Sequence, residues 1–370
     1  MTTALEDGLH SVVGEHGGVR EVFATALPHG SEGSAPLLQR LHGVVTDSRS
    51  EILELRVFGA LEAFPSFAET LRTLFGDIDW PLVFIQGEDC SGEDIAGIQL
   101  HGVAGTTVET IIEDGRPIGR VFEDEFARYC ILGNLHSFDS SRSRDRQTED
   151  TFELIGAGLA GAGMNLHSIV RTWFFLDDIL GWYQAFNQVR SDLYSKEGLF
   201  DRYLPASTGI GGSNPQNAAV VASVFAMQAK EEGVSVHEIP SPLQCPSMDY
   251  GSSFSRAAEV TTPDSRSIFV SGTASIDPDG ASVHLGDVNA QVAHTLEIVE
   301  AILRSRGMDF SDVTRGNAYF KNSAGAVSLK NHALRHGLPV SRLVVSQNDV
   351  CREDLLFELE IDAKRADRGS

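Results

Sequence analysis

Residues 354–363, DLLFELEIDA, alternate apolar and acidic side chains. A strand has a side-chain period of two, so the apolar residues fall on one face and Glu358, Glu360 and Asp362 on the other. One interpretation is a half-buried strand with its acids in water. The other is that one of the three acids lies in a pocket and transfers a proton.

A helical pattern lies upstream of this strand. A period of 3.6 places four apolar residues on one face: Val292, Leu296, Val299 and Leu303. Gly307 fits the position just beyond the helix, where glycine is favoured. Short β-runs at 268–271 and 316–320 flank the helix, and a second helix precedes the closing strand. This order predicts an α+β unit with its helices on one face of a sheet.

The same order of elements occurs earlier in the chain. The stretch from Arg146, RQTEDTFELIGAGLAGAGMNLHSIVRTWFFLDD, aligns without a gap with the stretch from Ala290, AQVAHTLEIVEAILRSRGMDFSDVTRGNAYFKN. The two are 144 positions apart, but the offset falls to 134 at the ends of the copies. The first copy therefore has about ten extra residues near YSKEGLFDRY.

This alignment bears on the acidic strand. Aligned from the Ala–Lys ends, the three acids face uncharged residues, namely Val224, Ala226 and Gln228. The strand of the first copy has thus lost its acids, although its alternation still allows it to fold. The acidic face of the second copy is therefore a candidate functional face.

The repeat predicts three regions: residues 1–125, a diverged unit at 126–232 and a second unit at 248–366. The first region contains β-runs such as PLVFIQ and a helix-like segment, FPSFAETLRTLFG, but no clear third copy. The glycine motif GAGLAG at 156–161 lies within the helix of the first copy, whereas a nucleotide-binding loop follows a strand. We interpret it as close helix packing.

Composition narrows the function further. The 370 residues carry a net charge of −23, which disfavours nucleic acid and anionic membrane surfaces as partners. We see neither an apolar run long enough to span a membrane nor a signal peptide, and we expect a cytoplasmic protein. The four cysteines form no CxxC, and the histidines form no convincing ligand cluster, so we expect neither a metal nor a cofactor.

Several motifs of the second copy occur together. They are the opening GSSFSRA, the strand FVSGTASI, the turn DPDG, the turn LPVSR and the closing ELEIDA. As a set over residues 251–364 they resemble the YjgF/Rid family. The tandem arrangement, with RYLPASTGIGGSNPQNA and YGSSFSRA, resembles the chorismatase family.

The resemblance implies an architecture and an activity. Two tandem YjgF/Rid-like units are expected to form a pseudo-trimeric barrel arrangement, with an N-terminal extension and one retained pocket, as a monomer or small homo-oligomer. The implied enzyme takes chorismate as its small-molecule substrate and releases pyruvate, through protonation of the enolpyruvyl ether. The product branch stays open between 3-hydroxybenzoate and 3,4-dihydroxycyclohexa-1,5-dienoate. We favour 3-hydroxybenzoate.

The resemblance also assigns the acid. Glu358 falls on the glutamate position that lines the pocket in YjgF-like proteins, whereas Glu360 and Asp362 are expected to be solvated. A carboxyl group among apolar neighbours has a raised pKa, which suits a general acid near neutral pH.

Arginines are expected to bind the two carboxylates of chorismate. Arg256 replaces the glutamine of the usual YjgF opening, and Arg342 lies in the LPVSR turn, where many family members have arginine one residue earlier. Tyr250 is placed for a hydrogen bond to substrate or for packing. Arg171 and Arg315 precede equivalent strands of the two copies, so we expect them to be structural.

Further candidates lie on loops and on the SG strand. Gly272 and Ala274 belong to the strand that faces the expected pocket. The cysteine at position 351 resembles the residue found there in chorismatases that form 3-hydroxybenzoate. The alanine at position 274 resembles the residue found there in chorismatases of the hydrolytic branch. Ser207 and Thr208 lie in the segment PASTGIGG. This segment either presents backbone N–H groups to an anion or simply forms a tight turn.

Two other classes of function remain open. One is a YjgF-type imine deaminase, and the other is a non-enzymatic small-molecule-binding protein. The duplication, Arg256 and the displaced arginine of the LPVSR turn favour chorismate.

Overall fold

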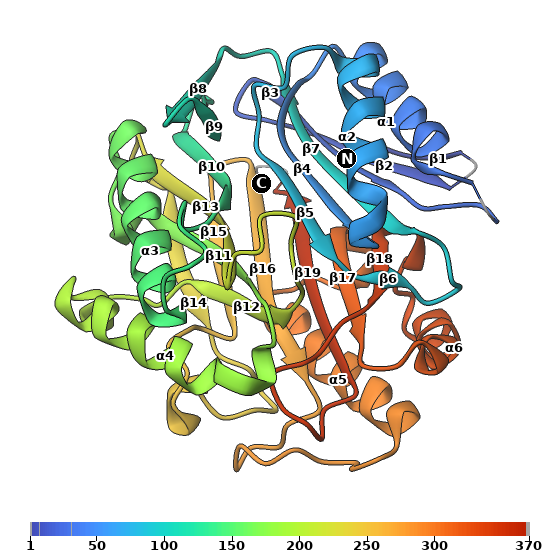
Figure 1. Cartoon of the computed structure of the whole chain (residues 1–370). Coiled ribbons are helices and arrows are strands. Elements are labelled where there is room, and N and C mark those ends of the chain that lie inside the picture. The colour runs from blue at the N-terminus through green and yellow to red at the C-terminus, as the bar shows by residue number, and fades with distance from the viewer. Residues whose placement is uncertain (1, 7, 31, 368–370) are drawn as a thin grey trace.

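The computed structural model describes residues 2–6, 8–30 and 32–367, with side chains from residue 8 onward. It contains three units, each a mixed β-sheet with two helices (Figure 1). No helix in these residues is both long and apolar enough to cross a membrane.

The N-terminal unit has the strand order β1-β2-β3-β7-β4-β5. Its elements are β1 (Thr2–Glu6), β2 (Leu9–His16), β3 (Val19–Ala26), α1 (Ser34–Ser48), β4 (Glu51–Gly59), α2 (Phe64–Phe75), β5 (Leu82–Gln86) and β7 (Ile95–Ala104). The short β6 (Glu88–Asp89) joins the C-terminal sheet instead.

The middle unit has the order β12-β11-β13-β10-β9-β8. Its elements are β8 (Val108–Glu113), β9 (Arg116–Glu123), β10 (Ala127–Leu135), α3 (Arg144–Gly161), β11 (Ile169–Leu176), α4 (Ile179–Lys196), β12 (Ala206–Gly211) and β13 (Val220–Ala229). The ten extra residues predicted for the first copy lengthen α4 to 18 residues, against 11 in its counterpart α6, and add a 3-10 turn at Leu199–Asp201.

The C-terminal unit has the order β14-β15-β16-β19-β17-β18-β6. Its own elements are β14 (Ser235–Ile239), β15 (Ala257–Thr261), β16 (Ser265–Ala274), α5 (Val288–Ser305), β17 (Val313–Phe320), α6 (Ala326–His336), β18 (Leu343–Gln347) and β19 (Phe357–Ala366). The remaining 3-10 turns are Leu61–Ala63, Leu166–Ser168, Ser247–Tyr250, Phe310–Asp312, Ser323–Gly325 and Val340–Arg342.

The topology repeats three times, not twice. Five strands follow one order in every unit: β2-β3-β7-β4-β5, β9-β10-β13-β11-β12 and β15-β16-β19-β17-β18. The N-terminal region therefore has the topology of the two copies although its sequence shows no third repeat. The borders also differ from those expected at 125 and 248, because residues 108–123 belong to the middle sheet and β14 to the C-terminal sheet.

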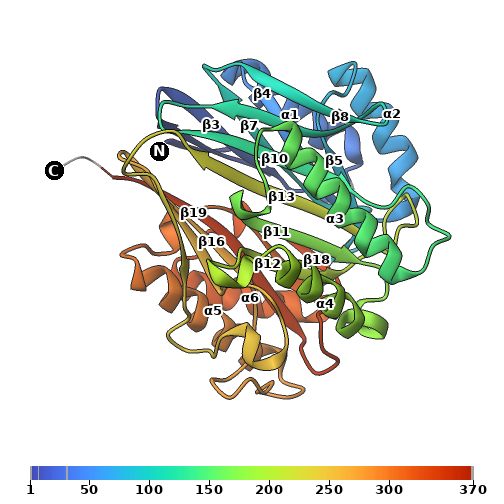
Figure 2. The ribbon, with the colours of Figure 1, turned by 90° about the vertical axis from the view of Figure 1, so that its left-hand side faces the viewer.

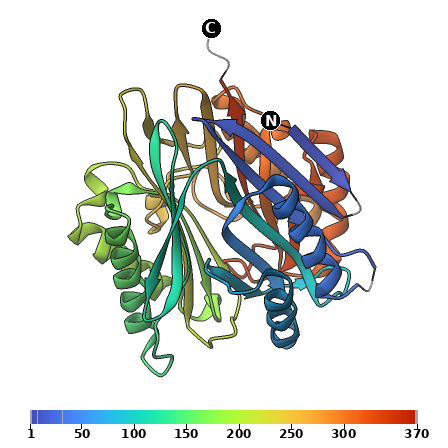
Figure 3. The ribbon, with the colours of Figure 1, turned by 90° about the horizontal axis from the view of Figure 1, so that it is seen from above.

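The three sheets share a central core, with the helices on the outside (Figures 2 and 3). Phe58, Phe175 and Tyr319 occupy the same place on β4, β11 and β17. The ring of Phe58 lies 5.9 Å from that of Phe175 and 5.8 Å from that of Tyr319. Any polar side chain on the inner face of a central strand is thus buried between units.

The helix predictions are confirmed. The four apolar residues of the predicted face are buried in α5, and Gly307 has a φ of 72° just beyond its end. GAGLAG lies within α3, where a methyl group on Gly158 would meet Leu132 at 2.9 Å. This close approach to the sheet accounts for the glycines.

The predicted register of the acidic strand is wrong by three residues. Glu358 lies opposite Tyr319, and its equivalent opposite Phe175 is Val221 rather than Val224. A shift by an odd number moves a residue to the other face of a strand. The true equivalents, Val221, Ser223 and Phe225, also lack acids.

Candidate active site

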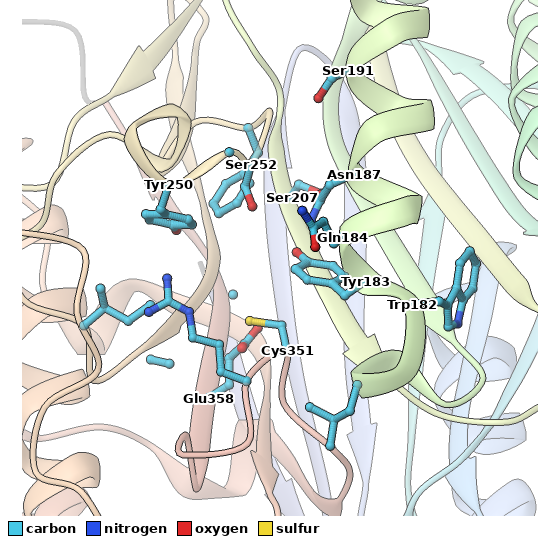
Figure 4. Close-up of a pocket in the computed structure, with 18 of the residues that line it drawn as sticks. Trp182, Tyr183, Gln184, Asn187, Ser191, Ser207, Tyr250, Ser252, Cys351 and Glu358 are labelled. Atoms are coloured by element: carbon cyan, nitrogen blue, oxygen red, sulfur yellow. The ribbon is translucent and has the colours of Figure 1, made fainter. Parts of the chain in front are cut away.

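A cavity of about 560 Å³ lies between the middle and C-terminal units. One wall is formed by α4 and β12, and the other by the segment around Tyr250, by β16 and by the loop and strand from Cys351 to Glu358 (Figure 4). Small-molecule sites have volumes of about 300–1,000 Å³. The cavity therefore has the size and inter-unit position of a ligand pocket.

Glu358 is the acid of this pocket. It lies on β19, opposite Ala274 of β16 and Tyr319 of β17, and is only 4% exposed. Burial and then the charge of Glu360 raise the pKa of Glu358 to about 8, against the opposing effect of Arg171 and Arg256. The carboxyl group thus holds its proton at neutral pH, as the sequence predicted.

Gly272 makes room for this carboxyl group. It lies in an irregular part of β16 between Val270 and Thr273, and its N–H donates to Thr208 Oγ1 at 2.9 Å. A Cβ at residue 272 would stand 2.0 Å from Glu358 Oε1. Glycine is therefore required here by the space that Glu358 takes.

The other two acids of the strand are buried, not solvated as expected. Glu360 is 2% exposed and accepts from Arg171 at 2.6 Å. Asp362 accepts from Arg315 Nε at 2.7 Å. The central core thus forces both acids into ion pairs, and the prediction that Arg171 and Arg315 are structural agrees with these contacts.

Arg256 supplies positive charge to the pocket. Its Nε donates to the carbonyl of Cys245 at 2.9 Å, while its buried Nη2 has no partner among the described residues. The guanidinium group lies 5.3 Å from the ring of Tyr250 and 5.8 Å from that of Phe254. It is held by its neighbours while one of its donors stays unused.

Cys351 lies on the same side of the pocket as Glu358 (Figure 4). Burial and then the charge of Glu358 raise the pKa of the Cys351 thiol to about 12. The side chain is therefore a neutral thiol at physiological pH. Among the described residues, no group of three or more His, Cys, Asp or Glu side chains is placed to hold a metal ion.

Known proteins resemble this arrangement. The family model described as Endoribonuclease L-PSP matches residues 252–364. A 3-hydroxybenzoate synthase of Streptomyces hygroscopicus is 28% identical over 221 residues, which cover 52% of this chain and 62% of the relative. A chorismatase of Streptomyces rapamycinicus is 26% identical over 237 residues, covering 56% of this chain and 66% of the relative. A chorismatase crystal structure at 16% identity has a TM-score of 0.66 and covers 93% of this chain and 98% of its own.

The chain is thus similar to chorismatases in part of its sequence and in its fold. Its matches with the two curated relatives span just under two thirds of their lengths. The likeness to the crystal structure extends over nearly the whole chain and supports the fold.

The pocket brings together seven of the nine residues expected in it: Glu358, Cys351, Arg256, Tyr250, Gly272, Ala274 and Ser207. Thr208 lies behind the wall, bonded to Arg171 and Glu360. Arg342 is elsewhere, donating to His10 Nε2 at 2.8 Å and to the carbonyl of Ser311 at 3.1 Å. Because its contact with His10 joins the C-terminal unit to the N-terminal unit, far from the cavity, we withdraw Arg342 from the candidate site.

Other residues of the pocket were missed from the sequence. Helix α4 contributes Tyr183 and a stripe of polar residues at helical spacing: Gln184, Asn187, Gln188 and Ser191. The buried Arg190 donates to Asn187 Oδ1 at 2.6 Å and to Ser207 Oγ at 3.4 Å. Arg352, next to Cys351, also lines the cavity. The polar stripe was the available signal, but a solvated helix face gives the same pattern.

Only one of the three pseudo-equivalent inter-unit positions carries the acid. The residue equivalent to Glu358 is Gly97 in the N-terminal unit and Val221 in the middle unit. At the first of these, Val344 fills the space, since a Cβ on Gly97 would meet it at 2.8 Å. Of these three equivalent positions, only the one at residue 358 thus carries an acid.

Proposed function

We propose that the protein is a chorismatase that cleaves the enolpyruvyl ether of chorismate and releases pyruvate. One observation carries the proposal: the protonated carboxyl group of Glu358 faces a cavity that also contains Arg256. Among the described residues, none forms a hydrogen bond with this carboxyl group, so its proton is available to a ligand.

The chemistry of an enol ether needs such an acid. Glu358 donates its proton to the terminal methylene carbon, which gives an oxocarbenium ion. Water adds to that ion and returns a proton to the Glu358 carboxylate. The hemiketal then collapses to pyruvate and the ring diol. Glu358 is regenerated in its protonated form, and one water molecule is consumed.

Two arginines are placed to bind the substrate carboxylates. Arg256 has an unpaired Nη2, and Arg352 lines the same cavity with its guanidinium group 5.0 Å from the ring of Tyr250. Charge-assisted hydrogen bonds from arginine are strong and directional. Because the protein has a net charge of −23, an anionic substrate needs such local contacts.

For the product we propose 3-hydroxybenzoate. It differs from the ring diol by the loss of one molecule of water, so this branch consumes no net water. Cys351 beside the acid and the relative named 3-hydroxybenzoate synthase support it. Ala274, which resembles the residue of the hydrolytic branch, favours the diol as the second candidate.

The test is to incubate the purified protein with chorismate, couple pyruvate to lactate dehydrogenase, and separate the aromatic products by chromatography. We expect pyruvate and 3-hydroxybenzoate in equal amounts, and no pyruvate from Glu358→Gln. Absence of pyruvate from the folded wild type would reject the proposal. Release of ammonia from an imine substrate would then point to the deaminase class.

A further inference from the structure

Two glutamates on the same face of β19 have opposite environments. Glu358 faces the cavity, and no described residue donates a hydrogen bond to its carboxyl group. Glu360, two residues on, is buried between the middle and C-terminal units, and both units donate hydrogen bonds to it. The two carboxyl groups therefore differ in the partners that surround them.

Four donors contact the carboxyl group of Glu360. Arg171 Nη2 donates to its Oε2 at 2.6 Å, and Thr208 Oγ1 donates to the same oxygen. Asn317 Nδ2 at 2.6 Å and Tyr319 OH at 2.9 Å donate to Oε1. Each oxygen of the Glu360 carboxyl group thus has two donors, which fix the side chain in place.

Arg171 depends on this one carboxylate. The residue is fully buried, and its Nε and Nη1 have no partner within the described part of the chain. Its guanidinium group lies 4.8 Å from the ring of Trp173. A buried cation that loses its partner is strongly destabilised and turns to the nearest remaining anion. The other acids on this face of β19 are Asp362, which is already bonded to Arg315, and Glu358, whose pKa Arg171 lowers.

The same contacts also fix the wall of the pocket. Thr208 Oγ1 donates to Glu360 and accepts from the N–H of Gly272, whose α-carbon lies against the carboxyl group of Glu358. We propose that Glu360 is a positioning residue that keeps Arg171 paired, so that Glu358 retains the proton it donates. The role of this proton in catalysis rests on the proposed function.

The other charged and titratable groups around Glu358 do not replace the contact between Glu360 and Arg171. Arg256, from the segment before β15, is the second cation that lowers the pKa of Glu358. Cys351, Tyr183 and Tyr319 come from the preceding loop, α4 and β17. Burial, the largest cause, raises the pKa of all three, so they are neutral at pH 7. Glu360 is thus the fixed negative charge that offsets the two arginines.

The direct test is a titration of Glu358 by NMR in protein labelled with 13C at the glutamate carboxyl group, with the signal assigned by its loss in Glu358→Gln. In Glu360→Gln we expect the pKa of Glu358 to fall by at least about one unit, a tenfold change in proton affinity. Arg171→Met is expected to raise it. The double variant of Glu360→Gln and Arg171→Met is expected to recover most of the shift in the pKa of Glu358. Asp362→Asn, which changes the next acid on this face, is the matched control.

A folded Glu360→Gln protein in which Glu358 titrates as in the wild type would overturn the proposal. A double variant in which the pKa of Glu358 stays as low as in Glu360→Gln would also overturn the proposal. Repulsion between the two carboxylates would then explain the shift without Arg171. If Glu360→Gln does not fold, Arg171→Met decides, and an unchanged pKa counts against the idea. The titration needs no chorismate, so it stands apart from the pyruvate assay, whose alkaline limit is expected to move with it.

Discussion

The α-carbon of Gly272 lies against the carboxyl group of Glu358, so that a methyl group at residue 272 would stand 2.0 Å from Oε1. The side chain that this methyl group would meet is not a flexible one at the surface, because Glu358 is itself buried. The acid of the pocket and the glycine of the SG strand are therefore a matched pair.

Gly272→Ala is expected to displace the Glu358 carboxyl group and to lower kcat for pyruvate release by about a hundredfold or more, since a shift of about 1 Å has that effect. Steady-state kinetics and circular dichroism check this. Gly156→Ala is the control, because nothing lies within 4 Å of the added methyl group in α3. Wild-type activity in Gly272→Ala would contradict the placement of Glu358.

The raised pKa of Glu358 also predicts how stability depends on pH. Between about pH 4.5 and 8 the unfolded chain loses this proton while the native protein keeps it, so the stability present below pH 4.5 is lost as the pH rises. Glu358→Gln should therefore stabilise the protein at pH 8.5 by something on the order of a few kcal/mol, and have little effect near pH 4.5. Urea denaturation at the two pH values measures the difference.

The activity of the wild type should follow the same group. Because the protonated form of Glu358 donates the proton, kcat/KM is expected to fall as the pH rises through about 8. An activity that continues to rise above pH 9 would indicate a different acid.

The two arginines singled out in the sequence should behave differently. Arg256→Gln removes a cation from the pocket, and we expect kcat/KM for chorismate to fall by about ten- to a hundredfold, the equivalent of one or two charge-assisted hydrogen bonds. Arg342→Gln removes one contact between units, with His10, and one within the C-terminal unit, with Ser311, so it should lower Tm and leave kcat/KM nearly unchanged. If kcat/KM fell equally in both variants, this would argue against a substrate site beside Arg256.

Cys351 is expected to influence the product rather than the release of pyruvate. The neutral thiol lines the same cavity as Glu358, which is the proposed proton donor. In Cys351→Ala we expect pyruvate release to continue while the share of 3-hydroxybenzoate falls and that of the ring diol rises. Quantitative chromatography of the products measures the ratio.

Cys90→Ala provides the matched control for that experiment. Cys90 precedes Gly97 by the same seven positions that separate Cys351 from Glu358, but it lies against a different cavity between the C-terminal and N-terminal units. The product ratio of Cys90→Ala should equal that of the wild type. An unchanged ratio in Cys351→Ala would remove the thiol from the product branch.

The sequence by itself determined the α+β units, the helix with its apolar face and the tandem repeat. These follow from local periodicity and from comparing one stretch of chain with another. The choice of Glu358 among the three acids came instead from the resemblance to the YjgF/Rid family. The topology of residues 1–125 was hidden, since packing of apolar residues tolerates substitution until no repeat is visible.

Tertiary structure alone decided the burial of Glu360 and Asp362. Alternation shows that a strand has a second face, but not whether water or another sheet covers that face. Here two further units cover it, and Arg171 and Arg315 meet the acids there. The same packing separated Arg256, which lines the cavity, from Arg342, which joins two units. Distances between residues far apart in the chain depend on how the units dock, and no local pattern encodes them.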